Sequence, residues 1–269
     1  MIATRLLVCY LVALGIVFSP PQLAARLIPV KHKEGTSHGF VVLRSQEGQT
    51  LATGDLIQTV EGEHVTSEIV LHFADGSIYD DTTVFSQTAD FRLITDHLRQ
   101  VGPSFPYSVD VRIDAASGTV EVISGTGEKR KTEEHHLKVP EDVADGIIST
   151  LLKNISPSEP ETVVSMVTTS SKPRVVKLKI HAEGKQSFTA SGEPLEATHY
   201  AIHTDIGGMA GAVAPVVGKQ PPDIHFWIVQ GKAPAFVKFT GQLYEGGPIW
   251  NIELAAMKWQ NTDSSSEKR

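Results

Sequence analysis

Residues Ser67–Ser86, SEIVLHFADGSIYDDTTVFS, decide the fold that this sequence predicts. Two runs rich in β-branched and apolar residues, Ser67–Phe73 and Ser77–Ser86, flank the short segment Ala74–Gly76. Asp-Gly between two such runs is typical of a β-hairpin, because both residues tolerate the positive φ that a tight turn requires. The stretch therefore predicts two antiparallel strands joined by a turn.

The same kind of pattern recurs along most of the chain. Val109, Val111 and Ile113 alternate with Asp110 and Arg112, and this period of two residues indicates a strand with one buried face. Short turns between about a dozen such runs favour antiparallel pairing over crossover connections. Because a sheet of that size has to curl, close or stack, we expect a mainly β fold. It is a strongly curved antiparallel sheet, a half-barrel or β-clam, with one or two helices packed on it.

One segment predicts a helix that could cover the concave side of this sheet. Pro140 and the two acidic residues after it are typical of a first helical turn. Val143, Ile147, Leu151 and Ile155 then repeat at a spacing of four residues. This spacing places them on one side of a helix, which we expect to pack on the sheet.

The N-terminus has the three parts of a secretory signal. Arg5 supplies a positive charge, Leu6–Phe18 is an uninterrupted apolar run, and Leu23–Ala25 offers a small-residue cleavage site. The apolar run is shorter than the roughly 20 residues that a membrane-spanning helix needs. We therefore expect residues 1–25 to be a signal peptide, and the mature protein to be periplasmic or secreted without a membrane span.

Composition divides the remaining chain into three parts. Residues 26–37 are expected to be a linker, residues 38–260 a single β-rich domain, and residues 261–269 a disordered polar tail. The only cysteine, Cys9, lies in the apolar run of the signal. A mature chain without cysteine has neither a disulfide nor a thiol nucleophile.

The charge and the motifs exclude several classes of function. A net charge of −7, from 24 basic and 31 acidic residues, disfavours binding to phosphate backbones, so no nucleic-acid partner is expected. The sequence contains no nucleotide-binding loop and no acyl-transfer motif. We therefore assign no catalytic residue and expect no cofactor, and the oligomeric state stays open.

Histidine and aspartate are plentiful but form no recognised metal motif. Among 11 histidines, His199 and His203 are four residues apart. On one strand they would share a face at a separation of about 13 Å, which is too far for a shared ion. Asp80 and Asp81 are consecutive, so on a strand they point to opposite faces. The sequence thus predicts no metal site.

The most distinctive stretch, Ile206–Trp227, is apolar and rich in small residues between Met209 and Val217. It has two interpretations. In the first it is a buried connection that plugs one end of the curved sheet, which is the default for apolar segments. In the second it is a mobile apolar lid at the mouth of a cavity, or a short membrane-touching element, because exposed apolar surface usually marks an interaction site. Aromatic residues follow it, and Phe226 and Trp227 would face opposite sides of a strand. The residues that we predict to line an apolar ligand are Met209, Val213, Val216, Val217, Phe226, Trp227 and Phe236.

Three stretches carry a resemblance to known proteins: PPDIHFWIVQGKAPAFVKFTGQLYEGGPIW at residues 221–250, the apolar element GKQPP at residues 218–222, and FADGSIYDDTTVFSQ at residues 73–87. They resemble a group of uncharacterised exported bacterial proteins that carry a domain of unknown function. This resemblance covers most of the mature chain and implies no known activity. More distantly, a signal followed by a curved antiparallel sheet resembles the β-clam architecture of periplasmic lipoprotein carriers. That second resemblance is one of architecture, and architecture does not fix function.

Together these features predict a non-enzymatic exported protein whose bent sheet binds an apolar or lipid-like ligand. One alternative is an envelope hydrolase acting on an ester or a glycan, which the unassigned histidines and aspartates favour. Another is a structural envelope protein that pairs with a partner through the edge of its sheet.

Overall fold

The structure is a computed structural model that describes residues 25–125, 130–190, 193–207 and 220–259. Nearly all of the expected signal peptide and the whole expected polar tail lie outside these residues. The described part of the chain contains one helix, α1 (Ile148–Asn154), and fourteen strands. In chain order the strands are β1 (Ser37–Arg44), β2 (Thr50–Glu61), β3 (His64–Phe73), β4 (Ile78–Gln87), β5 (Phe91–Val101), β6 (Val109–Asp114), β7 (Thr119–Ser124), β8 (Lys131–His136), β9 (Thr162–Val167), β10 (Val175–Ala190), β11 (Glu193–Asp205), β12 (Ile224–Val229), β13 (Ala235–Gln242) and β14 (Ile249–Trp259).

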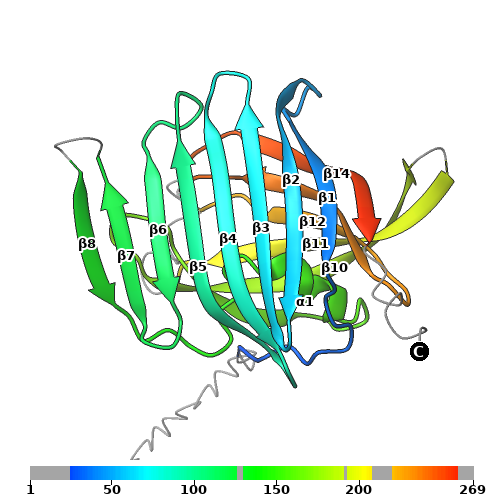
Figure 1. Cartoon of the computed structure of the whole chain (residues 1–269). Coiled ribbons are helices and arrows are strands. Elements are labelled where there is room, and N and C mark those ends of the chain that lie inside the picture. The colour runs from blue at the N-terminus through cyan, green and yellow to red at the C-terminus, as the bar shows by residue number, and fades with distance from the viewer. Residues whose placement is uncertain (1–24, 126–129, 191–192, 208–219, 260–269) are drawn as a thin grey trace, which may run out of the picture.

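All fourteen strands form one sheet, in the order β8-β7-β6-β5-β4-β3-β2-β1-β14-β13-β12-β11-β10-β9. The chain enters the middle of the sheet at β1 and adds strands one by one to β8 at one edge. It then crosses through α1 to β9 at the other edge and returns strand by strand to β14, which pairs with β1. The sheet bends around the helix, which lies between its two halves (Figure 1). The predicted curved antiparallel sheet with a helix packed on it is confirmed.

The stretch that predicts a hairpin forms the turn between β3 and β4. Gly76 has a φ of 86°, a left-handed conformation that glycine adopts without steric cost. One carboxylate oxygen of Asp75 accepts a hydrogen bond from the backbone N–H of Ser77 at 2.9 Å, and the other accepts one from the Ser104 hydroxyl at 2.7 Å. The Asp75 side chain therefore stabilises the turn and connects it to the loop before β6.

In most strands, alternate residues point into the hollow of the bent sheet. Val41 and Leu43 of β1, Leu71 of β3 and Phe85 of β4 are at most 1% exposed. Burying one such side chain contributes roughly 1.5–3 kcal/mol. The core is thus the concave side of the sheet, and the convex side faces solvent.

The helix is shorter than the spacing of apolar residues predicts, because it begins at Ile148 and not at Pro140. Gly146 has a φ of 66°, which an α-helix does not accommodate. Before it, Val143 forms a parallel bridge with Ser165 of β9. Both carboxylate oxygens of Asp145 accept the backbone N–H of Val167, at 2.9 and 3.2 Å. The residues just before the helix therefore form a turn that is hydrogen-bonded to β9.

The C-terminal end of α1 is attached to two other parts of the fold. The Tyr200 hydroxyl on β11 donates a hydrogen bond to the backbone carbonyl of Ile155 at 3.0 Å. The side-chain oxygen of Asn154 accepts the backbone N–H groups of Lys31 at 2.9 Å and His32 at 2.7 Å. Residues 26–37, which the composition predicts to be a linker, thus contact the fold at the helix.

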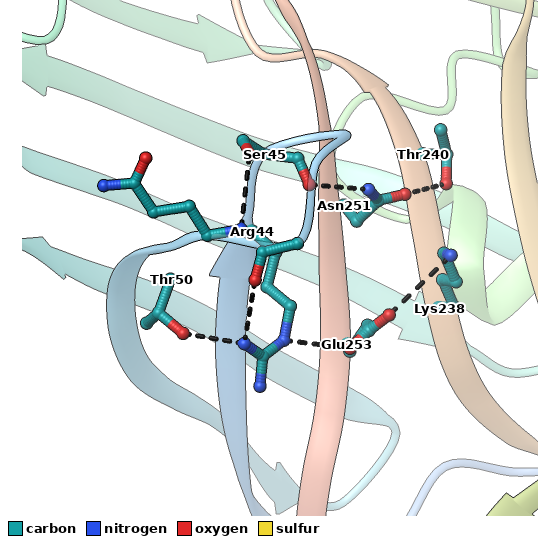
Figure 2. A network of polar contacts seen from close by, with 9 residues as sticks. Arg44, Ser45, Thr50, Lys238, Thr240, Asn251 and Glu253 are labelled. Atoms are coloured by element: carbon teal, nitrogen blue, oxygen red, sulfur yellow. Dashed lines mark hydrogen bonds and ion pairs between the residues drawn. The ribbon is translucent and has the colours of Figure 1, made fainter.

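Polar side chains on the convex face hold the junction of β1 and β14, where the two halves of the sheet meet (Figure 2). Arg44 contacts the carboxylate of Glu253 at 3.4 Å and donates to the hydroxyl of Thr50 at 2.7 Å. Lys238 approaches the other oxygen of Glu253 at 3.7 Å. These contacts connect β1, β13 and β14 on the side that the core does not cover.

Within the described ranges, no helix has both the length and the apolar character needed to cross a membrane.

The close approach of β2 and β3 depends on Gly54. A Cβ placed on Gly54 would lie 1.7 Å from the backbone oxygen of Val70, so any side chain would push the two strands apart. We expect Gly54→Ala to lower the free energy of unfolding by about 1–3 kcal/mol, as overpacking does. The measurement is urea denaturation followed by circular dichroism.

Gly35→Ala is the control, because a Cβ at Gly35 would meet no atom within 4 Å. It should change the free energy of unfolding by less than about 0.5 kcal/mol. Equal stabilities for the two variants would contradict the assigned contact between β2 and β3.

Candidate functional site

The concave face carries apolar side chains that the described residues cover only in part. Leu56, Ile69, Phe226, Phe239 and Leu254 pack against the core and keep partial exposure. Leu56 and Ile69 are neighbours across β2 and β3, and Phe226 and Phe239 are neighbours across β12 and β13. We call these five residues the inner apolar strip.

Aromatic contacts fix one end of the strip. The Phe226 ring packs edge-on against Phe239, with centroids 5.3 Å apart, and against Phe236, with centroids 6.2 Å apart. Edge-to-face pairs of this kind are favoured by the charge distribution of the rings. Phe236 is only 8% exposed, whereas Phe226 keeps partial exposure.

The structure separates the residues that the sequence predicts to line a ligand. Phe226 and Phe236 share the concave face. Trp227 lies on the convex face, stacked on His199 with the ring centroids 4.4 Å apart, because consecutive strand residues point to opposite sides. The other predicted lining residues lie outside the described residues: Met209, Val213, Val216 and Val217.

Three carboxyl groups come together on the concave face beside the strip. Asp81 of β4 is the cross-strand neighbour of Ile69. Asp96 of β5 is the cross-strand neighbour of Thr83, which lies two residues from Asp81 on the same face of β4. Asp145, in the turn before α1, faces them, since a Cβ on the adjacent Gly146 would lie 2.6 Å from the Asp96 carboxylate. We call Asp81, Asp96 and Asp145 the acid cluster.

Hydroxyl groups partner two members of the acid cluster. Thr83 donates a hydrogen bond to Asp96 at 2.7 Å, and the Tyr79 hydroxyl donates one to Asp81 at 3.3 Å. The second oxygen of Asp81 is buried and has no hydrogen-bond partner among the described residues. Tyr79 and Asp81 keep partial exposure, whereas Asp96 and Asp145 are buried. The Asp81 end of the cluster is therefore its accessible end.

Burial raises the pKa of every carboxyl in the cluster. The pKa of Asp96 rises from 3.8 to about 6. The pKa values of Asp81 and Asp145 lie well above the ordinary range, first because of burial and then because of the negative charge of Asp96. A raised pKa favours the protonated carboxyl, which donates a hydrogen bond instead of only accepting one.

The sequence points to only one member of this cluster. Asp81 stands next to Asp80 in the quoted hairpin, but Asp96 and Asp145 come from distant segments. A bulge in β5, opposite Val84 and Phe85 of β4, changes the phase of the strand, so that Asp96 and Leu98 lie on the same side as Leu93. The shared face of Asp96 and Leu98 can be read from the sequence, because the two residues are two positions apart. The change of phase at the bulge cannot.

A polar pocket of about 330 Å³ lies at the C-terminal end of α1, between residues 31–35 and 232–234. Its wall includes an ion pair between Lys153 and Glu34 at 2.6 Å, whose side chains are 11% and 6% exposed. The lining is mainly basic and polar, so it does not extend the inner apolar strip.

Asp96 provides a test of the acid cluster. A carboxyl with a raised pKa holds its proton more tightly in the folded protein than in the unfolded chain. The stability that it contributes is therefore fully present below pH 3.8 and is lost as the pH rises through about 6. Asp96→Asn keeps an acceptor for Thr83 but removes the titration.

We expect the difference in free energy of unfolding, Asp96→Asn minus wild type, to rise between about pH 4 and 6, by up to about 1.4 kcal/mol per pH unit. It should then level off. Urea denaturation at each pH measures this difference. Asp80→Asn, on the opposite face of the neighbouring strand β4, serves as the control because it makes the same chemical change outside the cluster. A difference for Asp96→Asn that does not change with pH would show that the cluster does not exist as described.

Comparisons with known proteins give similarity at the level of solved structures. No family model matches the sequence, and no curated protein matches it. A crystal structure of a beta-barrel-like protein of the domain of unknown function DUF1849 from Brucella abortus aligns over 88% of this chain and 100% of its own, at 13% identity and a TM-score of 0.44. The hypothetical lipoprotein YmcC from Escherichia coli K12 aligns over 82% of this chain and 84% of its own, at 9% identity and a TM-score of 0.32. The first is a protein of a domain of unknown function and the second is a hypothetical lipoprotein, and similarity at this level assigns no function.

Proposed function

We propose that this chain is an exported, non-enzymatic protein that binds an apolar or lipid-like ligand on the concave face of its curved sheet. The inner apolar strip carries this proposal. Leu56, Ile69, Phe226, Phe239 and Leu254 face the hollow and keep partial exposure among the described residues. Covering apolar surface contributes roughly 25 cal/mol per Å², so an apolar chain lying along the strip gains free energy.

The acid cluster limits the head group of the ligand. Asp81 and Tyr79 lie next to Ile69, at one side of the strip, and the raised pKa of Asp81 favours a neutral hydrogen-bond donor there. A carbonyl or hydroxyl group can accept or exchange such a hydrogen bond. A phosphate would meet carboxyl groups in a protein of net charge −7. The proposed ligand is therefore an uncharged lipid, such as an acylglycerol, or a protonated fatty acid.

Export is the second part of the proposal. Residues 1–25 act as a cleavable signal, and residues 38–260 form one domain in the periplasm or outside the cell. The tripartite pattern of the N-terminus supports this, as does the confinement of the only cysteine to that signal. A ligand of low solubility in water needs a protein to bind it in the aqueous periplasm or outside the cell, and this is the role that we propose.

The composition of one edge strand argues against the alternative of a structural protein that pairs with a partner through that edge of its sheet. The edge strand β8, with sequence KTEEHH, is charged or polar at every position and largely exposed. Charged residues on an edge strand disfavour pairing with another chain. This observation favours the ligand-binding proposal over assembly through β8.

Fluorescence titration with a dansylated fatty acid tests ligand binding. We expect binding with an increase in dansyl fluorescence, and displacement by a monoacylglycerol. Phe226→Ser removes an accessible ring from the strip and should weaken binding about tenfold, the equivalent of about 1.4 kcal/mol. Phe40→Ser is the matched control, because Phe40 is 41% exposed on the convex face of β1, and it should bind like the wild type.

Native mass spectrometry of protein purified from the envelope of expressing cells provides a second measurement. We expect an added mass that organic extraction identifies as a neutral lipid or fatty acid. Circular dichroism confirms that both variants are folded. Protein that carries no lipid and shows no dansyl displacement, or equal losses of affinity for Phe226→Ser and Phe40→Ser, would refute the proposal.

A further inference from the structure

The convex face of β10, β11 and β12 gathers histidine side chains around one position. His199 of β11 is the cross-strand neighbour of Trp227 on β12 and of Gly184 on β10. His225 of β12 is the neighbour of Ala201, two residues further along β11. Because residues two apart on a strand share a face, His199 and His225 both lie outside the core, on the side opposite the inner apolar strip.

A β-bulge turns a carboxylate toward this pair. The register of β10 against β11 shifts between Ala182 and Gly184, which leaves Glu183 as the extra residue. Gly184 has a φ of 116°, a conformation that side chains rarely adopt. Bulges commonly redirect a side chain, and they are enriched beside functional sites. Here the bulge brings Glu183 to His199.

The distances within this group match those of a metal site. His199 Nε2 lies 3.0 Å from His225 Nδ1, and His199 Nδ1 lies 3.1 Å from a carboxylate oxygen of Glu183. One ligand atom from each of the three residues falls within 4.8 Å of the others. Two imidazole nitrogens bound to one tetrahedral zinc ion at about 2.0 Å lie roughly 3.3 Å apart. A small shift of either ring therefore admits an ion between the two nitrogens.

The surroundings hold the His199 ring in place. His199 is 9% exposed, and its ring stacks on Trp227 with an angle of 1° between the planes. In the tautomer that donates Nδ1–H to Glu183, His199 presents the lone pair of Nε2 toward His225. Metal-ligating histidines almost always have such an acceptor on the other nitrogen.

We propose that Glu183, His199 and His225 form a binding site for a divalent transition-metal ion on the convex face. His199 Nε2 and His225 Nδ1 bind the ion, which replaces the hydrogen bond between them, and Glu183 orients His199. Water completes the coordination. Imidazole ligands suit copper and zinc, and copper(II) binds more tightly than zinc at such sites. The site is independent of the ligand proposed for the concave face.

His203 shows why spacing along the chain does not reveal this site. It lies on the same face of the same strand, but its Nδ1 contacts the carboxylate of Asp223 at 2.8 Å. The partner of His199 comes instead from the neighbouring strand. His203→Ala is therefore a matched control, because it removes one histidine from β11 without touching the proposed ligands.

Titration of tag-free protein with Cu²⁺ and Zn²⁺ by calorimetry tests the proposal. We expect one equivalent of either ion to bind, with Cu²⁺ tighter, and Cu²⁺ to quench the fluorescence of Trp227. Electron paramagnetic resonance of the Cu²⁺ complex should show coupling to two imidazole nitrogens. His225→Ala should lose this binding, Glu183→Gln should weaken it about 10- to 100-fold, and His203→Ala should bind like the wild type.

The thermal unfolding of each variant without metal shows whether it is folded. Glu183→Gln is nearly isosteric, so it tests the site even if His225→Ala is destabilised. The proposal is overturned if neither ion binds stoichiometrically. It is also overturned if folded Glu183→Gln and His225→Ala bind as the wild type does, or if His203→Ala loses binding equally.

Discussion

The curvature of the sheet depends on the segment that crosses from one edge of the sheet to the other. Fourteen strands leave thirteen intervals between β8 and β9, which in a flat sheet at about 4.8 Å each would separate the edges by roughly 62 Å. Residues 137–161 cover the whole connection, and they fold into turns and a helix. A connection of this kind is compact, so the sheet has to bend until its two edges lie within the reach of this segment.

The crossing segment also holds the two halves at a defined position. The carboxylate of Asp145 accepts a hydrogen bond from the backbone N–H of Val167 on β9, while the adjacent Gly146 lies against Thr83 of β4. At the other end of the helix, Ile155 accepts the hydroxyl of Tyr200 on β11. The acid cluster exists because this segment brings Asp145 onto the inner face of β4 and β5. The curvature and the candidate site therefore have the same origin.

The alternation of side chains gives the two faces of β11 and β12 different chemistry. On the concave side, Tyr200 and Phe226 contribute to the core and to the inner apolar strip. On the convex side, His199 and Trp227 stack on each other. One pair of strands thus contributes to a proposed lipid site and to a proposed metal site, separated by the thickness of the sheet.

Local patterns in the sequence predict most of the strands and the hairpin around Gly76, because alternation and turn residues are properties of neighbouring positions. The same patterns misplace the start of the helix, because a contact with β9 and the left-handed Gly146 outweigh the apolar spacing. They also miss the acid cluster and the pairing of His199 with His225. Both groups join residues from different strands, and their proximity depends on strand order and on bulges, which no local window contains.

Photolabelling with a fatty acid that carries a diazirine in its chain shows where an apolar ligand lies on the protein, because the label reacts with whatever it touches. We expect adducts to concentrate on inner residues of β2, β3, β12 and β13, with Phe226 and Ile69 among them, and unlabelled monoacylglycerol to suppress them. Adducts confined to convex residues such as Phe40, or inner residues that stay unlabelled, would show that the hollow is filled by the protein itself and binds no apolar ligand.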